Sequence, residues 1–265
     1  MKREFIELSL SEQEAERIAW ELFGIKGTAQ SLPGEIDMNF KIEVPDGNAY
    51  VLKVSRPETT VEYLQFQQEL LQHLETCDTE LEHPRAIAAR DGLLVSPYEI
   101  HSAVRHVRLL SWVPGRMYSQ VNPQTDALRL SLGRVCGRIS SALQSFEHKE
   151  GQRRLDWDIA QGEWTVGHLE LFPSIRSKTL RYFLERFESH RQSYALLRKS
   201  MVHNDANDNN ILVSENLAHP SVVTTIDFGD TIYTQIINDL AVACAYAAMN
   251  LHDPLQGILP VIRGY

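Results

Sequence analysis

Two stretches in the second half of the chain decide its fold. The chain reads MVHNDANDNNILV at residues 201–213 and TTIDFGD at residues 224–230. Each stretch joins a short run of apolar, β-branched residues to a cluster of carboxyl and amide side chains, which predicts two short strands with polar loops at their ends. Because little chain separates the two strands, we expect them to pair and to bring their polar loops together.

The polar residues of these loops suit phosphoryl transfer. His203 and Asp205 are followed by Asn210, and Asp227 opens the run Asp-Phe-Gly-Asp. Phosphoryl transfer needs a carboxylate that accepts a hydrogen bond from the attacking hydroxyl, and hard oxygen ligands that hold Mg²⁺ against the phosphates. Asp205 is the candidate for the first role, and Asn210 and Asp227 are candidates for the second. We expect His203 to position the loop backbone rather than to titrate during turnover.

Ordinary turn chemistry explains part of the same pattern. Asn and Asp between apolar runs are common loop residues, so Asn207, Asp208 and Asn209 fit a plain turn equally well. Alone, His-x-Asp followed by Asn is a weak signal. Together with the Asp-Phe-Gly-Asp run, which lies one hairpin further along the chain, it becomes a strong signal for phosphoryl transfer.

A lysine within an apolar strand is an independent signal. Lys53 lies in the run YVLKVS, residues 50–55. A buried ammonium is costly unless it is paired, and a triphosphate would pair it, whereas an edge-strand lysine facing water is the alternative. The run GEIDMNF, residues 34–40, is a candidate phosphate cap. Since it has a single glycine, it also fits a simple hairpin turn.

The pattern of apolar residues predicts a strand-rich first part and a helical remainder. The run Ser11 to Glu14 forms a capping box that opens a helix to about Leu22, closed by Gly24. The other expected elements are strands over 25–32, 38–44, 49–54 and 106–113, a hairpin of 84–89 with 93–97, and helices over 58–75, 123–146, 175–197 and 236–249. The expected elements change from mainly strands to mainly helices near residues 112–115. We therefore expect a hinge there, between lobes 1–112 and 113–265.

Composition excludes several classes of protein. The net charge of −9 argues against a nucleic-acid partner, because phosphate backbones are bound by clusters of Lys and Arg. No run is apolar and long enough for a membrane span, and the first residues lack a secretory signal, so we expect a cytoplasmic protein without a membrane partner. The three cysteines predict neither a disulfide framework nor a zinc site.

These motifs resemble the aminoglycoside phosphotransferase family, which has the protein-kinase-like fold. The resemblance runs from Leu32 to the helix after Asp239, and its specific parts are residues 203–210, 226–230 and 238–241. Within the family, the sequence resembles most the hydroxylysine-kinase branch. It also resembles the kinase domains fused to class-III aminotransferase-like phospho-lyases.

The resemblance implies an α+β fold with two lobes. The N-terminal lobe, an antiparallel sheet, would bind ATP or GTP, and the mainly helical C-terminal lobe would carry the catalytic and metal loops. Asp205 would be the catalytic base, Asn210 and Asp227 would bind Mg²⁺, and Asp239 would be a structural aspartate beneath the catalytic loop. The nucleotide-binding residues implied are Lys53 on the α- and β-phosphates, Asn39, Gln67, and Trp112 and Val113 of the hinge strand.

Two departures from the family pattern matter. Family members pair the strand lysine with a glutamate from the next helix, where this chain has Gln67. Family members also continue with further helices that help to close the substrate pocket. Truncation at residue 265 and further domains in the full-length protein are therefore both left open.

The expected substrate is a small cationic alcohol, such as a hydroxylysine-like amino acid, an amino alcohol or an aminoglycoside. Asp208 and Asp230 are the candidate residues for its ammonium group. The main alternative is a catalytically silent nucleotide-binding domain of a larger protein, which Gln67 favours and the intact set of Asp205, Asn210 and Asp227 opposes. A protein kinase is disfavoured because no Ala-Pro-Glu motif follows the Asp-Phe-Gly run and an apolar helix is expected almost directly after it. A metal-dependent hydrolase lacks histidines in ligand spacing.

Overall fold

The computed structural model describes residues 10–34, 37–77 and 80–265. The chain divides into two compact units, unit 1 with Met1–Glu75 and His83–Val113, and unit 2 with Thr76–Glu82 and Pro114–Tyr265. The chain start, on which the expectation of no secretory signal rests, lies outside the described residues. So do Glu35 and Ile36 of the candidate phosphate cap. The predicted nucleotide-binding role of the first lobe stays a prediction at this point.

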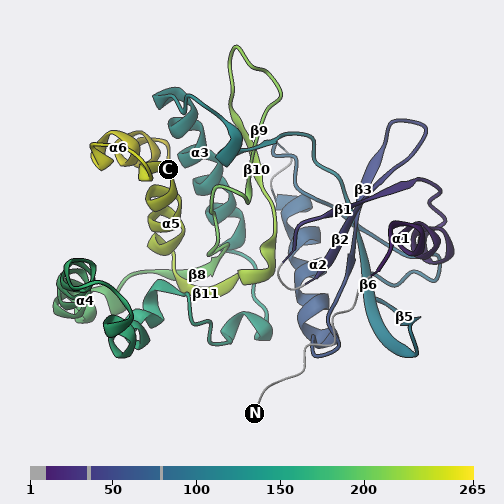
Figure 1. The fold of residues 1–265 in the computed structure, drawn as a ribbon, viewed down its shortest axis with the longest axis horizontal. Coiled ribbons are helices and arrows are strands. Elements are labelled where there is room, and N and C mark those ends of the chain that lie inside the picture. Colours follow the sequence, from purple (N-terminus) through teal and green to yellow (C-terminus); the bar gives the residue numbers. More distant parts are fainter. Residues whose placement is uncertain (1–9, 35–36, 78–79) are drawn as a thin grey trace. The chain divides into compact units, whose positions relative to one another are not determined.

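Unit 1 is built on an antiparallel sheet with strand order β1-β2-β3-β6-β4, in which β5 also pairs with β6 (Figure 1). The strands are β1 (Thr28–Leu32), β2 (Met38–Glu43), β3 (Ala49–Val54), β4 (Ala86–Ile87), β5 (Ser96–Ile100) and β6 (Ala103–Ser111). The helices are α1 (Glu12–Ile18), continued by a π-helical turn over Ala19–Phe23, and α2 (Val61–Cys77). The predicted α+β class with an antiparallel N-terminal sheet is therefore confirmed.

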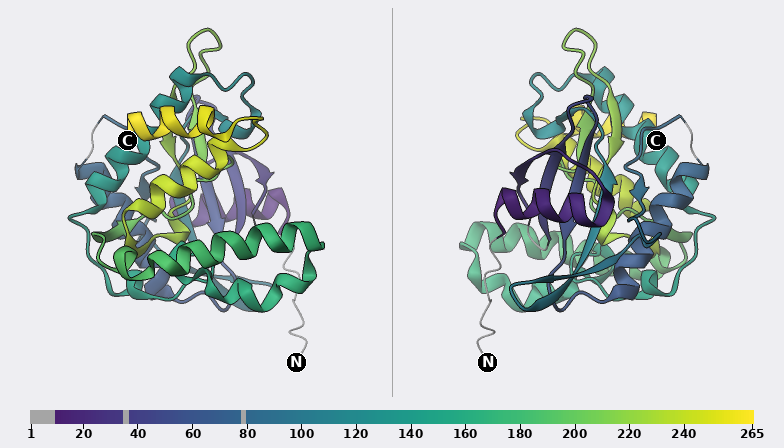
Figure 2. Two further views of the ribbon diagram at one scale, coloured as in Figure 1. Left: turned by 90° about the vertical axis from the view of Figure 1, so that its left-hand side faces the viewer. Right: turned by 90° about the vertical axis from the view of Figure 1, so that its right-hand side faces the viewer.

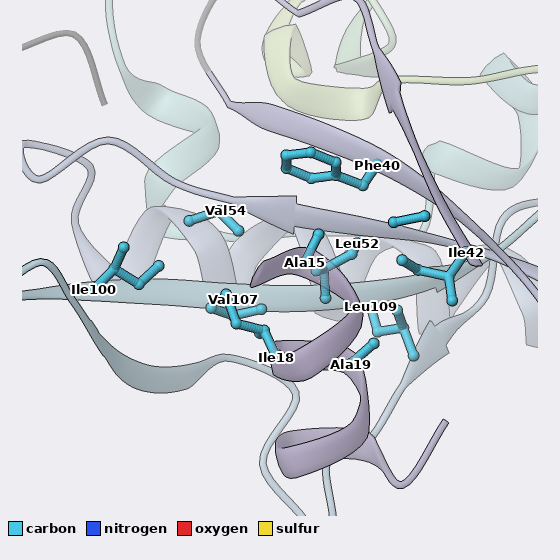
Figure 3. Close-up of a cluster of buried hydrophobic side chains, with 11 residues drawn as sticks. Ala15, Ile18, Ala19, Phe40, Ile42, Leu52, Val54, Ile100, Val107 and Leu109 are labelled. Carbon is cyan, nitrogen blue, oxygen red and sulfur yellow. The ribbon is translucent and has the colours of Figure 1, made fainter. Parts of the chain in front are cut away.

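The core of unit 1 lies between α1 and one face of this sheet. Alternate residues of the strands point toward α1, among them Leu52, Val107 and Leu109, and they bury their side chains completely (Figure 3). The predicted capping box is present, since Ser11 and Glu14 exchange hydrogen bonds, and Gly24 ends the helical stretch at a φ of 74°. The strand residues between these core positions, Lys53 and Arg108 included, point to the opposite face, where α2 packs.

One sequence-based prediction in unit 1 is wrong. Segments 84–89 and 93–97 share one backbone hydrogen bond beside the turn at Gly92, from Ala89 N–H to the Leu93 carbonyl (2.8 Å), but they form no strand ladder with each other. Both β4 and β5 instead pair with β6, which is long enough to hold the two strands end to end along one edge. The tight turn that joins β5 to β6 lies at His101 and Ser102, whose φ values of 49° and 64° are those of a two-residue hairpin.

Unit 2 combines helices with two small sheets. Its helices are α3 (Asp126–Leu143), α4 (Ser174–Ala195), α5 (Ile237–Ala248) and α6 (Pro254–Gly264), and its 3₁₀ turns are η2 (Tyr118–Gln120), η3 (Lys149–Gln152), η4 (Ile159–Leu171) and η5 (Phe228–Asp230). The strands β10 (Val222–Thr225), β9 (Ile211–Val213) and β7 (Arg116–Met117) form one sheet, and β11 (Ile232–Gln235) and β8 (Lys199–Val202) form the other. The predicted helices and the β9–β10 hairpin are confirmed, whereas α6 was not predicted.

Helices α3, α5 and α6 pack against one another, and α3 and α6 approach closely (Figures 1 and 2). Glycines permit this approach. A Cβ on Gly133 would lie 2.0 Å from the backbone oxygen of Val261, and a Cβ on Gly264 would lie 2.1 Å from that of Leu130. Helix α4, in contrast, buries none of its residues. None of the described helices has the length and apolar character needed to cross a lipid bilayer.

We expect Gly133→Ala to destabilise unit 2, because the added methyl group would have to push two backbones apart. The free energy of unfolding should fall by about 1–3 kcal/mol, the usual cost of overpacking, although alanine is the better helix former. Urea unfolding followed by circular dichroism measures this. Gly162→Ala is the matched control, since a Cβ at Gly162 meets no atom within 4 Å. Equal stability of the two variants would show that α3 and α6 are not packed this closely.

Candidate active site

The catalytic loop predicted at residues 203–210 joins β8 to β9, and Asp239 anchors its start. Asp239 lies at the beginning of α5 and is almost completely buried. Its carboxylate accepts hydrogen bonds from the backbone N–H groups of His203 (3.2 Å) and Asn204 (2.8 Å) and from the Ser140 hydroxyl (3.0 Å). Burial raises the pKa of Asp239, and the donors from Asn204, Ser140 and His203 act against that rise.

His203 joins the catalytic loop to the strand that precedes Asp227. Its Nδ1 accepts a hydrogen bond from the backbone N–H of Asp205 (3.2 Å), so the ring carries its proton on Nε2, which donates to the carbonyl of Ile226 (3.0 Å). The ring also packs edge-on against Phe228, with 4.6 Å between ring centroids. Both ring nitrogens of His203 therefore form hydrogen bonds to backbone groups.

Two asparagines of the loop hold the carboxylate of Asp205. Asn207 Nδ2 donates to Oδ1 (2.8 Å) and Asn210 Nδ2 donates to Oδ2 (2.7 Å). Asn210 Nδ2 also donates to the backbone oxygen of Asp205 (3.0 Å). These bonds fix both oxygens of Asp205 and orient the amide of Asn210, whose Oδ1 accepts no hydrogen bond within the described part of the chain.

Asp227 follows β10 in an unusual backbone conformation. Its φ of 59° lies in the left-handed region, and Asn204 of the catalytic loop has a φ of 65°. Such conformations are uncommon outside glycine and gather at functional sites. The Asp227 carboxylate accepts a hydrogen bond from Gly229 N–H (3.3 Å) and caps the short helix η5, while the residue itself is exposed.

The β9–β10 hairpin brings the two polar loops together (Figure 1). The backbone N–H of Ile226 donates to the carbonyl of Asn210 (2.8 Å), so the ends of both strands lie side by side. The pKa of Asp205 is raised, chiefly by burial and further by the negative charges of Asp230 and Asp227. Burial likewise raises the pKa of Asp230, with a contribution from Asp227. The structure therefore gathers Asp205, Asn210, Asp227 and Asp230 in one place.

Asp208 belongs to the same loop, and η2 supports it. Ser119 N–H donates to the backbone oxygen of Asp208 (2.9 Å), and the Ser119 hydroxyl donates to the side chain of Asn209 (2.8 Å). Tyr246 of α5 lies near enough to Asp205 and Asp208 for their charges to raise its pKa, after burial as the main cause.

Sequence reasoning missed three residues of this site, Tyr246, Arg153 and Trp157. Arg153 donates to the backbone oxygens of Gly229 (2.6 Å) and Thr231 (2.7 Å), and so holds the segment after Asp227. The indole N–H of Trp157, a largely exposed side chain, donates to Asp230 (2.8 Å). Arg153 and Trp157 come from an irregular stretch before η4 whose sequence has no period and no motif, so no local signal identifies them.

The nucleotide-binding residues predicted for the first lobe lie in unit 1. Lys53 is almost buried on β3 and lies directly opposite Asn39 of β2. Gln67 of α2 is also buried, and its side-chain oxygen accepts a hydrogen bond from Arg108 of β6 (2.5 Å). Asp37 forms ion pairs with Arg108 and, at 3.9 Å, with Lys53. Arg108 and Asp37 were not among the predicted residues.

The predicted hinge residues follow the end of β6. The backbone N–H of Trp112 donates to the carbonyl of Ala49 (3.0 Å), and the ammonium of Lys41 lies 4.6 Å from the centre of a Trp112 ring. Val113 is nearly buried and is the last residue of unit 1.

The donor set near Asp205 fits Mg²⁺ bound through few protein ligands. Asn210 offers an amide oxygen and Asp227 a carboxylate, and magnesium commonly completes its shell with water and phosphate oxygens. Across the described residues, no group of three or more His, Cys, Asp or Glu side chains is arranged to hold a metal ion by protein ligands alone.

The model of the phosphotransferase enzyme family, APH, matches residues 28–259. The chain belongs to this family, and it is an enzyme, a phosphotransferase with an alcohol group as acceptor. The family predicted from the motifs is thereby confirmed.

The chain is also similar in sequence and in structure to several kinases that act on small molecules. The chain is 23% identical to hydroxylysine kinase of Mus musculus, with 96% of this chain and 74% of the relative aligned, and 25% identical to hydroxylysine kinase of Xenopus laevis, with 97% and 75% aligned. Among solved structures, amicoumacin kinase hAmiN in complex with AMP-PNP, Ca²⁺ and Ami superposes with a TM-score of 0.70 at 17% identity, over 97% of this chain and 77% of the other. A microcompartment-associated aminopropanol kinase gives a TM-score of 0.66 at 20% identity, over 96% and 80%. These structures share the fold.

We expect Asp230→Asn to stabilise the protein at neutral pH. Because the pKa of Asp230 is raised above its ordinary value of 3.8, the wild-type protein carries an unfavourable charge there whenever the pH exceeds that raised pKa. The amide removes the charge and keeps an oxygen for the Trp157 indole. The melting temperature of the variant should exceed that of the wild type at about pH 7, and the difference should shrink as the pH falls toward 3.8.

Thermal unfolding measured across this pH range tests the expectation. Asp46→Asn, at an exposed turn between β2 and β3, is the control for the loss of one negative charge. If Asp230→Asn lowers the melting temperature at neutral pH, the half-buried carboxylate stabilises the fold, and the electrostatic account of the site is wrong.

Proposed function

We propose that the protein transfers the γ-phosphate of ATP or GTP to a hydroxyl group of a small amine-bearing molecule. The acceptors we favour are a hydroxylysine-like amino acid, an amino alcohol or an aminoglycoside. The observation that carries the proposal is the position of the Asp205 carboxylate. Asn207 and Asn210 hold its two oxygens by hydrogen bonds, and Asp227 lies close to it.

Asp205 would act on the acceptor. Its carboxylate would accept the hydrogen bond of the substrate hydroxyl, orient the oxygen for attack on the γ-phosphorus, and take up the proton as the new P–O bond forms and the bond to the leaving diphosphate breaks. The donors from Asn207 and Asn210 hold the two carboxylate oxygens in place, so little reorganisation is needed at that moment.

Asn210 and Asp227 would hold Mg²⁺, and Lys53 would bind the phosphates. The metal, when bound, supplies positive charge that neutralises the phosphate oxygens. Asn210 contributes its side-chain oxygen because its side-chain nitrogen is already used on Asp205. Asn39, Gln67, Trp112 and Val113 keep their proposed roles around the nucleotide.

The proposed cationic acceptor is supported by the charge of the site. Asp208 and Asp230 lie near the proposed base, and the exposed indole of Trp157 lies beside Asp230. Carboxylates attract an ammonium group, and an aromatic face attracts it further. The named relatives point the same way, since hydroxylysine and aminopropanol each combine an amine with a hydroxyl.

We expect Asp205→Asn to lower kcat by about 10²- to 10⁴-fold, because general-base catalysis supplies rate factors of this size. The dissociation constant of the nucleotide should stay within about threefold of the wild-type value, since the proposed role touches the acceptor only. Steady-state kinetics and equilibrium binding of ATP and GTP measure the two effects. Nearly full activity in this variant would show that another group takes up the proton.

The pH profile of the wild-type enzyme gives a second readout of Asp205. Since burial raises the pKa of this carboxyl, kcat/KM should fall as the pH drops through the raised pKa, at a higher pH than an ordinary aspartate would allow. Asp205→Asn should remove this acidic limb from the residual activity. An acidic limb that persists in the variant would assign the titration to another group.

A substrate screen tests the acceptor. We expect turnover of 5-hydroxylysine, 1-amino-2-propanol or an aminoglycoside, and poor turnover of sugars and polyols that lack an amine. Asp208→Asn should raise KM for the amine by about tenfold, the effect of losing one favourable charge contact, and leave KM for a neutral alcohol unchanged. Turnover confined to neutral sugars would contradict the cationic acceptor and leave the phosphotransferase assignment intact.

A further inference from the structure

Unit 1 buries a second cation beside Lys53. Arg108 is 2% exposed, and in the pairing of β3 with β6 it lies directly opposite Lys53. On the other side of Lys53, the pairing of β2 with β3 places Asn39. Because residues paired directly across strands point to the same face, these three side chains form a row across the sheet on the face that α2 covers.

The contacts of Arg108 link this row to two further side chains. Nη1 donates to Gln67 Oε1 (2.5 Å), and Nη2 donates to Asp37 Oδ2. The same Oδ2 lies 3.9 Å from the ammonium of Lys53, so one carboxylate oxygen faces two cations. Two buried polar atoms of this row have no hydrogen-bond partner within the described residues. Arg108 Nε donates no hydrogen bond there, and Asn39 Oδ1 accepts none.

Burial of a guanidinium without a full set of partners is costly, and arginine does not lose its proton to escape that cost. The unused N–H of Arg108 Nε is therefore a donor that a further acceptor can use. A triphosphate offers more oxygens and more negative charge than a single carboxylate. It can contact both cations at once, whereas Asp37 does so through one atom.

We propose that Arg108 is a second phosphate-contacting cation beside Lys53, and that Asp37 is a built-in carboxylate that the nucleotide triphosphate displaces. The inference rests on the proposed function for the presence of a nucleotide. Asp37 is the residue directly before β2, so a change in its own side-chain rotamer would move the carboxylate away from the two cations.

Gln67 supports this role through its neutrality. As a hydrogen-bond acceptor, its amide oxygen ties α2 to Arg108 without neutralising the guanidinium. A carboxylate at the same position would keep the contact and cancel the charge. The chain thus holds Arg108 in place through Gln67 and keeps its charge for the phosphates.

Two isosteric substitutions with opposite expected signs test the inference. Asp37→Asn removes the competing charge and should tighten ATP binding about 3- to 10-fold, while Gln67→Glu adds a competing charge and should weaken ATP binding by a similar factor. Adenosine is the control ligand, because it lacks phosphates, and its affinity should not change in either variant. Calorimetry on the whole chain, with ATP against adenosine and GTP against guanosine, measures both effects.

Arg108→Lys is a third variant for the same binding measurements. It keeps the charge but loses the fork that bonds Gln67 and Asp37 together, so ATP binding should weaken while adenosine binding stays the same.

The outcomes separate this inference from the proposed function. Weaker ATP binding in Asp37→Asn, or equal shifts for ATP and adenosine, would show that Asp37 merely supports the fold and would overturn the inference alone. Unchanged ATP binding in both isosteric variants would also overturn it, while wild-type binding of ATP would leave the proposed function standing. A wild-type protein that binds neither ATP nor GTP would contradict both.

Discussion

The buried carboxylate of Asp239 is the constraint on which the catalytic loop depends. A single side chain from α5 accepts hydrogen bonds from two successive backbone N–H groups at the start of that loop and from a hydroxyl of α3. Charge-assisted bonds of this kind offset the cost of burying the carboxylate. Since His203 is fixed by this anchor, its ring can hold both the backbone of Asp205 and the strand before Asp227.

The same region concentrates features that disfavour folding. Asn204 and Asp227 adopt left-handed backbone conformations, and burial and mutual repulsion raise the pKa values of Asp205 and Asp230. Neither feature helps the fold, and both suit a site that binds a cation and positions a carboxylate. Arg108 of unit 1 is likewise a charged side chain whose burial is costly, since it is only 2% exposed.

Much of the fold could be predicted because its elements have strong local signals. The apolar runs of β2 and β3, the helical spacing in α3 and α5, and the two polar loops around the β9–β10 hairpin are readable from the sequence. The pairing of β4 and β5 was predicted wrongly, because the choice of partner for a short strand depends on which edge of β6 is vacant. Arg108, Asp37, Arg153 and Trp157 escaped prediction for a similar reason, since only tertiary pairing gives each of them its partner. Arg108 had one signal, since it is a charged residue inside the strand predicted over residues 106–113.

The most direct test of this account is the rate of phosphoryl transfer in a single turnover, with Mg²⁺ and saturating ATP or GTP, for the wild-type enzyme and Asp239→Asn. The amide has one oxygen where the carboxylate has two, so the loop loses part of its anchor while unit 1 is unchanged. We predict that the folded variant binds nucleotide as the wild type does and transfers phosphate at least about tenfold more slowly. Transfer at the wild-type rate in the folded variant would show that the catalytic loop does not depend on Asp239.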